Sequence, residues 1–154
     1  MGLDASVRCN CIKDGLATPH PFPELLRLDE TCEPILESAD EIPLAKWTEH
    51  DRWFERSCSH GGYVLQKRLG NATFIGHVLA FVNSVADELP ILRDKVVYSG
   101  THCGDFIEAE ESVPLLEEAR LLRQLSKDRN TQQFASDMIE LCEASLATGN
   151  PIVF

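Results

Sequence analysis

The chain has 154 residues, of which 44% are hydrophobic and 25% are charged. This length and composition predict a single globular domain, 1–154, and exclude a disordered or fibrous protein. With 14 basic against 25 acidic residues the formal net charge is −11, which argues against a protein that binds nucleic acid by electrostatic attraction.

The first eleven residues lack the apolar run of a secretion signal, and no later stretch approaches the ~20 apolar residues of a membrane span. We therefore expect a cytoplasmic protein without a membrane partner. In that compartment the six cysteines are expected as free thiols, metal ligands or a nucleophile rather than as disulfides.

The first half of the chain predicts two strands, one helix and one segment of ambiguous type. Residues 3–11 alternate between apolar and polar side chains, which is the period of a half-buried strand. A proline-rich loop over 13–23 and a short strand over 24–28 follow. A helix is expected to begin at Pro43 or Thr48 and to end near Cys58. Residues 63–69 fit a strand or a helix.

The second half predicts three helices and two strands. Asn71 is expected to cap a helix over 72–87, and residues 95–99 are expected to form a strand that leads into a loop over 100–105. Further helices are predicted over 112–127, capped by Ser112, and over 132–147, ended by Gly149. Residues 151–154 can form a closing strand. The predicted fold class is α/β or α+β, a single domain in which three or four helices pack on a small mixed β-sheet.

Three short pairs of thiol and imidazole side chains raise the question of a zinc site: Cys9-x-Cys11, Cys58-x-His60 and His102-Cys103. Structural zinc sites usually pair their ligands as C-x2–4-C, which none of these pairs matches. Four of the cysteines also fall at apolar periodic positions, which favours small core side chains; they are Cys9, Cys11, Cys58 and Cys142. We therefore expect no cofactor, with zinc as the alternative.

The loop over 99–105 is the predicted ligand site, because it follows an expected strand and contains chemistry that periodicity does not explain. The ligand-binding candidates are His60, Thr101, His102, Cys103 and Asp105. No catalytic residue is assigned, since the sequence has no phosphate loop, dinucleotide motif or nucleophile elbow. A metal-dependent or thiol-dependent enzyme centred on this loop and His60 is one hypothesis, and a tight structural turn is the other.

Acidic residues are concentrated over 24–51, a segment that contains nine acidic and two basic residues. Such a segment is either a solvated surface or a docking surface for a basic protein. The candidate partner-binding residues are Glu30, Glu33, Glu37, Asp40 and Glu41. The leading functional hypothesis is a non-enzymatic acidic protein-binding module, such as an immunity-type inhibitor of a basic toxin.

Three motifs carry a resemblance: Cys9-Asn10-Cys11, the Ser-Gly-Thr-His-Cys-Gly-Asp run over 99–105, and the ending Gly-Asn-Pro-Ile-Val-Phe over 149–154. On these motifs the chain resembles a group of small uncharacterised bacterial proteins over most of its length. The resemblance implies no activity, cofactor or catalytic residue. In size and acidity alone the chain is also similar to bacterial immunity proteins.

Overall fold

The computed structural model describes residues 2–85 and 87–154. Strand β1 (Gly2–Arg8) pairs with β4 (Tyr63–Asn71) on one side and with β6 (Ile152–Val153) on the other. Strand β5 (Phe106–Ile107) pairs with β6 and completes the order β4-β1-β6-β5. A separate hairpin joins β2 (Leu26–Leu28) to β3 (Pro34–Leu36). The fold is α+β in a single domain, and each of these pairs is antiparallel.

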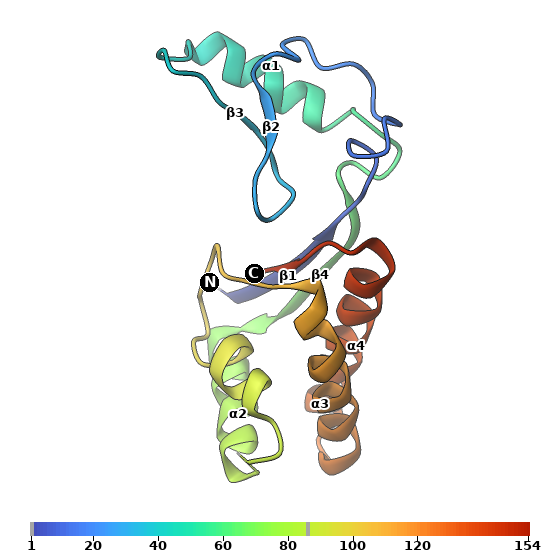
Figure 1. The fold of residues 1–154 in the computed structure, drawn as a ribbon. Helices are drawn as coiled ribbons and strands as arrows, with labels where there is room; N and C mark the ends of the chain where they lie inside the picture. The colour runs from blue at the N-terminus through green and yellow to red at the C-terminus, as the bar shows by residue number, and fades with distance from the viewer. Residues whose placement is uncertain (1, 86) are drawn as a thin grey trace.

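Helices cover one face of the four-stranded sheet. Both α2 (Ala72–Ser84) and α4 (Arg129–Thr148) contact β1 and β4, and α3 (Ser112–Leu125) packs along α4 (Figure 1). Helix α1 (Leu44–Phe54), a π-helical turn η1 (Leu92–Val96) and a 3-10 turn η2 (Ala109–Glu111) complete the described elements. Among the described residues, no helix has the length and apolar character needed to cross a membrane.

Helix ends are fixed by local side-chain chemistry. Asn71 caps α2 as predicted, because its Oδ1 accepts a hydrogen bond from Phe74 N at 2.8 Å. Asp128 caps α4 in the same way, so the helix begins at Arg129, three residues before its predicted start. Gly149 ends α4 in a left-handed conformation (φ 71°), which confirms the expected helix stop.

The core lies between the sheet and the helices. The alternation expected for the first strand is confirmed over β1, where Leu3, Ala5 and Val7 are buried. They face a cluster that includes Phe134 and Cys142 from α4, both buried as predicted.

The strand predicted over 95–99 is wrong, because residues 92–96 form the π-helical turn η1. The Glu118 carboxylate accepts hydrogen bonds from the backbone N–H groups of Ile91 (3.0 Å) and Leu92 (2.8 Å) and so holds the start of this turn. Leu92 and Val96 then enter the core on the same side of the turn. Val96 and Val97, the apolar residues that suggest a strand in the sequence, are both buried at the end of this helical turn.

Two other predicted boundaries change. Helix α1 ends at Phe54 rather than near Cys58, and the ambiguous residues 63–69 belong to strand β4. Strand β1 ends at Arg8, so Cys9 and Cys11 lie beyond the strand rather than on its apolar face. Of these two cysteines, Cys11 is buried and Cys9 is half-buried.

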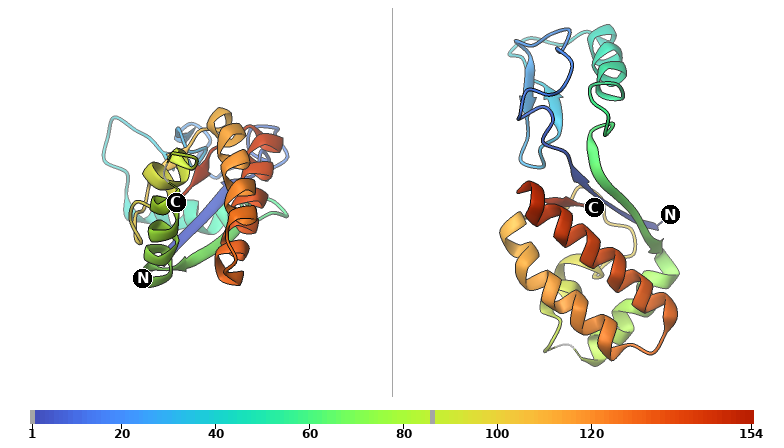
Figure 2. Two further views of the ribbon diagram at one scale, coloured as in Figure 1. Left: turned by 90° about the horizontal axis from the view of Figure 1, so that it is seen from below. Right: turned by 90° about the vertical axis from the view of Figure 1, so that its right-hand side faces the viewer.

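Residues 9–62 form one long connection between the paired strands β1 and β4, which we call the β1–β4 lobe. It contains the β2–β3 hairpin and α1, and it projects from the sheet on the side away from α2, α3 and α4 (Figure 2). None of its residues belongs to the main hydrophobic cluster, and its buried hydrophobic residues are Cys11 and Leu36. Because so few apolar side chains are buried in the lobe, its fold needs another source of stability.

Candidate metal centre

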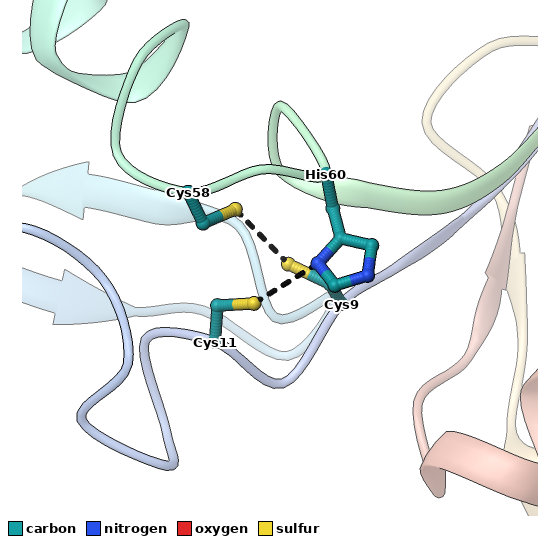
Figure 3. Close-up of side chains that lie close together, drawn as sticks. All are labelled: Cys9, Cys11, Cys58 and His60. Carbon is teal, nitrogen blue, oxygen red and sulfur yellow. Dashed lines mark hydrogen bonds between the residues drawn. The ribbon is translucent and has the colours of Figure 1, made fainter.

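Four side chains converge where the chain enters and leaves the β1–β4 lobe. Cys9 and Cys11 come from the entering segment, and Cys58 and His60 from the leaving segment (Figure 3). Their three sulfur atoms and one ring nitrogen all lie within 4.8 Å of one another. We call this group the neck cluster.

Backbone hydrogen bonds hold the two segments side by side. Cys9 N donates to Gly62 O at 3.1 Å, which extends the contact between β1 and β4 by one step beyond the strands. Cys11 O accepts from Leu16 N and Ala17 N, at 2.8 and 3.0 Å, and this turn directs Cys11 back toward the neck.

The segment that supplies Cys58 and His60 is a tight turn. Gly61 N donates to Cys58 O at 3.1 Å and closes the turn. Gly61 and Gly62 both have positive φ angles, +58° and +86°. A side chain at Gly62 would place its Cβ 2.3 Å from the Phe54 ring, so both the conformation and the packing require glycine.

The thiols of the neck cluster differ in their ease of ionisation. Burial raises the pKa of Cys58, but hydrogen bonds from backbone N–H groups of Gly62 and His60 and from the neighbouring thiols outweigh it and lower the pKa to about 6. Burial, followed by the adjacent Cys9 and Cys58, raises the pKa of Cys11 to about 12. Backbone N–H donors around a thiolate are also suited to a sulfur that binds a metal.

The distances fit a single tetrahedral ion. Zinc–sulfur bonds of about 2.3 Å place two sulfur ligands about 3.8 Å apart, and a sulfur and a nitrogen ligand about 3.5 Å apart. Cys9 Sγ and Cys58 Sγ are 3.7 Å apart, and Cys11 Sγ is 3.2 Å from His60 Nδ1. Donors gathered this closely favour one ion over a two-iron cluster, whose ligands are divided between two metals.

A second layer of polar side chains surrounds the neck cluster. The fully buried Asn150, just after α4, donates through Nδ2 to Arg8 O and to Asn10 Oδ1, both at 2.8 Å. Asn10 in turn donates to Thr148 O at 2.8 Å. Arg8 and Asn10 flank Cys9, so Asn150 holds the backbone on one side of Cys9 and the Asn10 side chain on the other.

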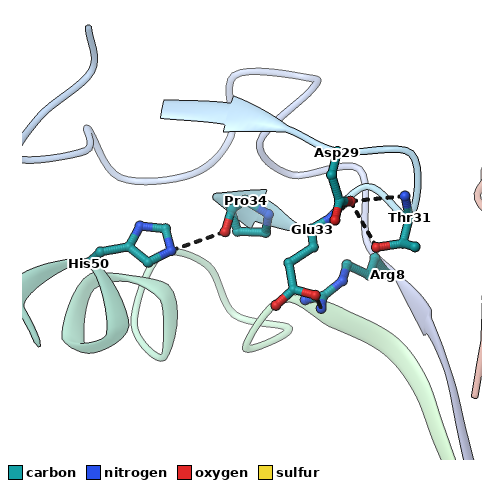
Figure 4. A network of polar contacts seen from close by, with 6 residues as sticks. All are labelled: Arg8, Asp29, Thr31, Glu33, Pro34 and His50. Carbon is teal, nitrogen blue, oxygen red and sulfur yellow. Dashed lines mark hydrogen bonds and ion pairs between the residues drawn. The ribbon is translucent and has the colours of Figure 1, made fainter. Parts of the chain in front are cut away.

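Arg8 connects the β2–β3 hairpin to the neck of the lobe. Its Nη2 lies 2.8 Å from Glu33 Oε2 (Figure 4). Its guanidinium also lies over the Tyr63 ring, 4.7 Å from the ring centroid. Arg8 Nε and Nη1 are buried without a partner. A small pocket of about 10 Å³ is lined by Arg8, Cys9 and Cys58 among others, and its volume is about that needed for one water molecule.

The loop over 99–105 does not contribute to the neck cluster. His102 Nε2 is 2.8 Å from Val96 O, and Nδ1 is 3.1 Å from Asp105 Oδ2 although outside hydrogen-bond geometry. Both ring nitrogens therefore face protein oxygens rather than an open ligand position. Tyr98 stacks on the His102 ring and donates to Asp105. This geometry favours the structural-turn hypothesis for the loop.

The remaining predicted site residues are distributed as follows. Thr101 and Cys103 are exposed on the loop, and neither joins a group of potential metal ligands among the described residues. Of the ligand candidates, only His60 lies in the neck cluster. Three residues interpreted as core cysteines complete it: Cys9, Cys11 and Cys58.

The acidic partner-binding candidates all lie on the β1–β4 lobe with exposed side chains: Glu30, Glu33, Glu37, Asp40 and Glu41. Two of them are engaged within the lobe. Glu33 pairs with Arg8, and Glu37 lies 3.7 Å from Arg27.

Comparison with known proteins adds no relative: no family model, no curated protein and no solved structure matches this chain.

Proposed function

We propose that this chain is a zinc-binding protein in which one Zn²⁺, held by Cys9, Cys11, Cys58 and His60, anchors the β1–β4 lobe to the α+β body. The observation that carries the proposal is the convergence of four donor atoms within 4.8 Å at the neck of the lobe. Because the lobe has only two buried hydrophobic residues, a metal at its base supplies the stability that its core lacks.

The donor set favours a structural role for the ion. Three thiolates and one imidazole fill all four tetrahedral positions, whereas a catalytic zinc keeps one position open for water or substrate. Each pair of ligands comes from one side of the neck, so a bound ion closes the lobe as a loop. Zinc therefore acts on folding rather than on a substrate.

Metal analysis of untagged protein, purified without chelators, tests this proposal. We expect about one zinc per chain in the wild type and in C103S, which removes an exposed thiol outside the neck cluster. The C11S variant, which loses a buried ligand, is expected to lose the metal. A folded wild-type protein that neither contains zinc nor takes it up from solution would contradict the proposal.

We further propose that the anchored lobe is the surface that docks a basic protein, as an immunity-type inhibitor would. The supporting observation is that all five acidic candidates are exposed on this one lobe. Concentrated charge of one sign accelerates association with an oppositely charged partner and makes it sensitive to salt.

Charge reversal tests the docking proposal. We expect that replacing Glu30, Glu37, Asp40 and Glu41 by lysine abolishes salt-sensitive binding of basic proteins, measured by affinity chromatography at low ionic strength. Glu33 is left intact because it pairs with Arg8. Reversal of four exposed acids outside the lobe, Asp87, Glu88, Glu108 and Glu110, is the control with the same change in net charge. Equal binding by both variants would contradict the proposal.

A further inference from the structure

Two of the proposed zinc ligands are also placed to react with each other. We propose that the neck cluster is a site of thiol oxidation, at which hydrogen peroxide or a related hydroperoxide converts Cys9 and Cys58 into a disulfide and releases the zinc. The inference rests on the proposed zinc site, because it assigns a mode of regulation to the same four residues.

The geometry selects this pair of sulfurs. Cys9 Sγ and Cys58 Sγ are 3.7 Å apart, and the hydrogen bond between Cys9 N and Gly62 O keeps their segments adjacent. A disulfide requires a sulfur separation of about 2.05 Å, so the two side chains need to approach by less than about 2 Å. Rotation of two cysteine side chains covers such a distance without separating β1 from β4.

The third thiol of the neck cluster is placed differently. Cys11 is buried, and its sulfur is directed at His60 Nδ1 at 3.2 Å. Cys58 is half-buried in a turn whose neighbours Ser59 and His60 are exposed. A small hydroperoxide therefore reaches the Cys58 side of the cluster from solvent.

The three cysteines outside the neck cluster do not compete for this pairing. Cys142 is fully buried on α4, and Cys103 is exposed on the loop over 99–105. Cys32 is half-buried, and its Sγ donates to Asn150 Oδ1 at 3.4 Å. None of the three belongs to the group of sulfurs within 4.8 Å of one another.

The reaction is a two-electron oxidation. The Cys58 thiolate attacks one peroxide oxygen and breaks the O–O bond, which gives a sulfenic acid and, after protonation, one water. The Cys9 thiolate then attacks the Cys58 sulfur and expels the hydroxyl group as a second water. In total two thiolates, one peroxide and two protons give one disulfide and two waters. Zinc loses two of its four ligands and leaves.

The disulfide replaces zinc as the link across the neck. It joins the same entering and leaving segments that the ion joined, so the lobe stays attached to the body. Oxidation thus exchanges a four-ligand anchor for a single covalent one and leaves Cys11 and His60 without a metal.

The experiment treats zinc-loaded protein with one equivalent of hydrogen peroxide. Zinc release is followed with a colorimetric chelator, and disulfides are mapped by mass spectrometry of unreduced digests. We expect one zinc released for each Cys9–Cys58 disulfide formed, and recovery of zinc binding after reduction with dithiothreitol. The C32S and C103S variants are expected to behave as the wild type does.

Separate results would overturn the inference and the proposed function. Retention of zinc, a different disulfide, or oxidation of Cys58 to a sulfinic acid without a disulfide would overturn the inference alone. The C11S variant keeps both reacting sulfurs and lacks one zinc ligand, so it tests the pairing without metal. A wild type that never binds zinc would overturn the proposed function and with it the zinc release, whereas a Cys9–Cys58 disulfide in peroxide-treated C11S would still support the pairing of the two sulfurs.

Discussion

Asn150 is a single buried side chain that joins the C-terminal end of α4 to both neighbours of Cys9. Its Nδ2 donates to Arg8 O and Asn10 Oδ1, and its Oδ1 accepts from Lys13 Nζ at 2.6 Å. Replacing a side chain that orients a metal ligand typically lowers the affinity for the metal by about 10- to 100-fold. The orientation of Cys9 therefore depends on a residue that follows it by more than a hundred positions.

We predict that N150A lowers zinc affinity by about 10- to 100-fold, because it removes the hydrogen bonds on both sides of Cys9. N10A is expected to have a similar effect through the same link. Competition with a chelator of known affinity measures both variants, and S136A, which alters a hydrogen bond within α4, is the control.

A double-mutant cycle separates this orienting role from general destabilisation. If Asn10 and Asn150 act through one link, the loss of zinc affinity in N10A/N150A is smaller than the sum of the two single losses. Strictly additive losses of zinc affinity, or affinities equal to that of the wild type, would show that Asn150 does not orient Cys9.

At the scale of elements, two buried histidines connect the loop over 13–23, helix α1 and strand β3. Phe22 N donates to His20 Nδ1 at 2.9 Å, so His20 carries its proton on Nε2 and donates to His50 Nδ1 at 3.1 Å. His50 Nε2 then donates to Pro34 O at 3.0 Å. Because its Nδ1 accepts a hydrogen bond, the His20 ring is neutral in this arrangement.

This arrangement predicts that the lobe loses stability in mild acid. Burial lowers the pKa of His20, the neighbouring His50 lowers it further, and the nearby Glu24 carboxylate opposes the shift only in part. The unfolded state, with a histidine pKa of about 6.5, therefore binds more protons than the folded state below that pH. The stabilisation is complete above about pH 6.5 and decreases as the pH falls through and below it.

Tryptophan fluorescence measures this effect, because the Trp53 ring contacts the His20 ring with centroids 4.4 Å apart. We expect a change between pH 7.5 and 5.5 that is largely lost in H20Q and preserved in H77Q, where the altered histidine is on α2. Zinc content measured at each pH separates the histidine effect from metal loss. An unchanged pH profile in H20Q would argue against the assignment.

Local sequence signals predicted most of the elements of the body. Asn71 and Gly149 mark helix ends through hydrogen bonds and backbone conformations that involve only nearby residues. The prediction of a strand over 95–99 was wrong because a helical turn forms there instead. That turn is stabilised by hydrogen bonds to the Glu118 carboxylate, which comes from a distant part of the chain. Periodicity reports local burial, and it carries no information on such a partner.

The neck cluster was missed for a related reason. The apolar alternation of β1 continues through Cys9 and Cys11, so both read as core residues although the strand ends at Arg8. Their partners Cys58 and His60 are each 49 positions away, and neither pair has the spacing usual for zinc. The useful signal is the repetition of two ligand pairs with the same one-residue separation, the second followed by two glycines.

At the scale of the whole molecule, the body and the lobe differ in what stabilises them. The body has a continuous core from the sheet and its helices, whereas the lobe is joined to it through the neck cluster and contacts such as Arg8 with Glu33. Regions with few buried apolar contacts open locally at low free-energy cost. Metal removal should therefore affect the lobe while the body remains folded.

We predict that chelation of zinc makes the lobe susceptible to trypsin at Arg27, Arg52 and Arg56. All three arginine side chains are solvent-exposed and lie within the β1–β4 lobe. Since a ligand at 100 times its Kd stabilises the bound state by about 2.7 kcal/mol, lobe cleavage should be about 100-fold slower in zinc than in chelator when opening limits exposure. Mass spectrometry of the first fragments and far-UV circular dichroism measure the two parts separately. C103S should reproduce this protection, and C11S should be cleaved rapidly with or without zinc. Equal cleavage rates for wild type in both conditions, or a loss of body helicity on chelation, would mean that zinc does not act specifically on the lobe. The expected asymmetry follows from the position of the ion, because a metal at the neck closes the one segment of the chain that the hydrophobic core does not hold.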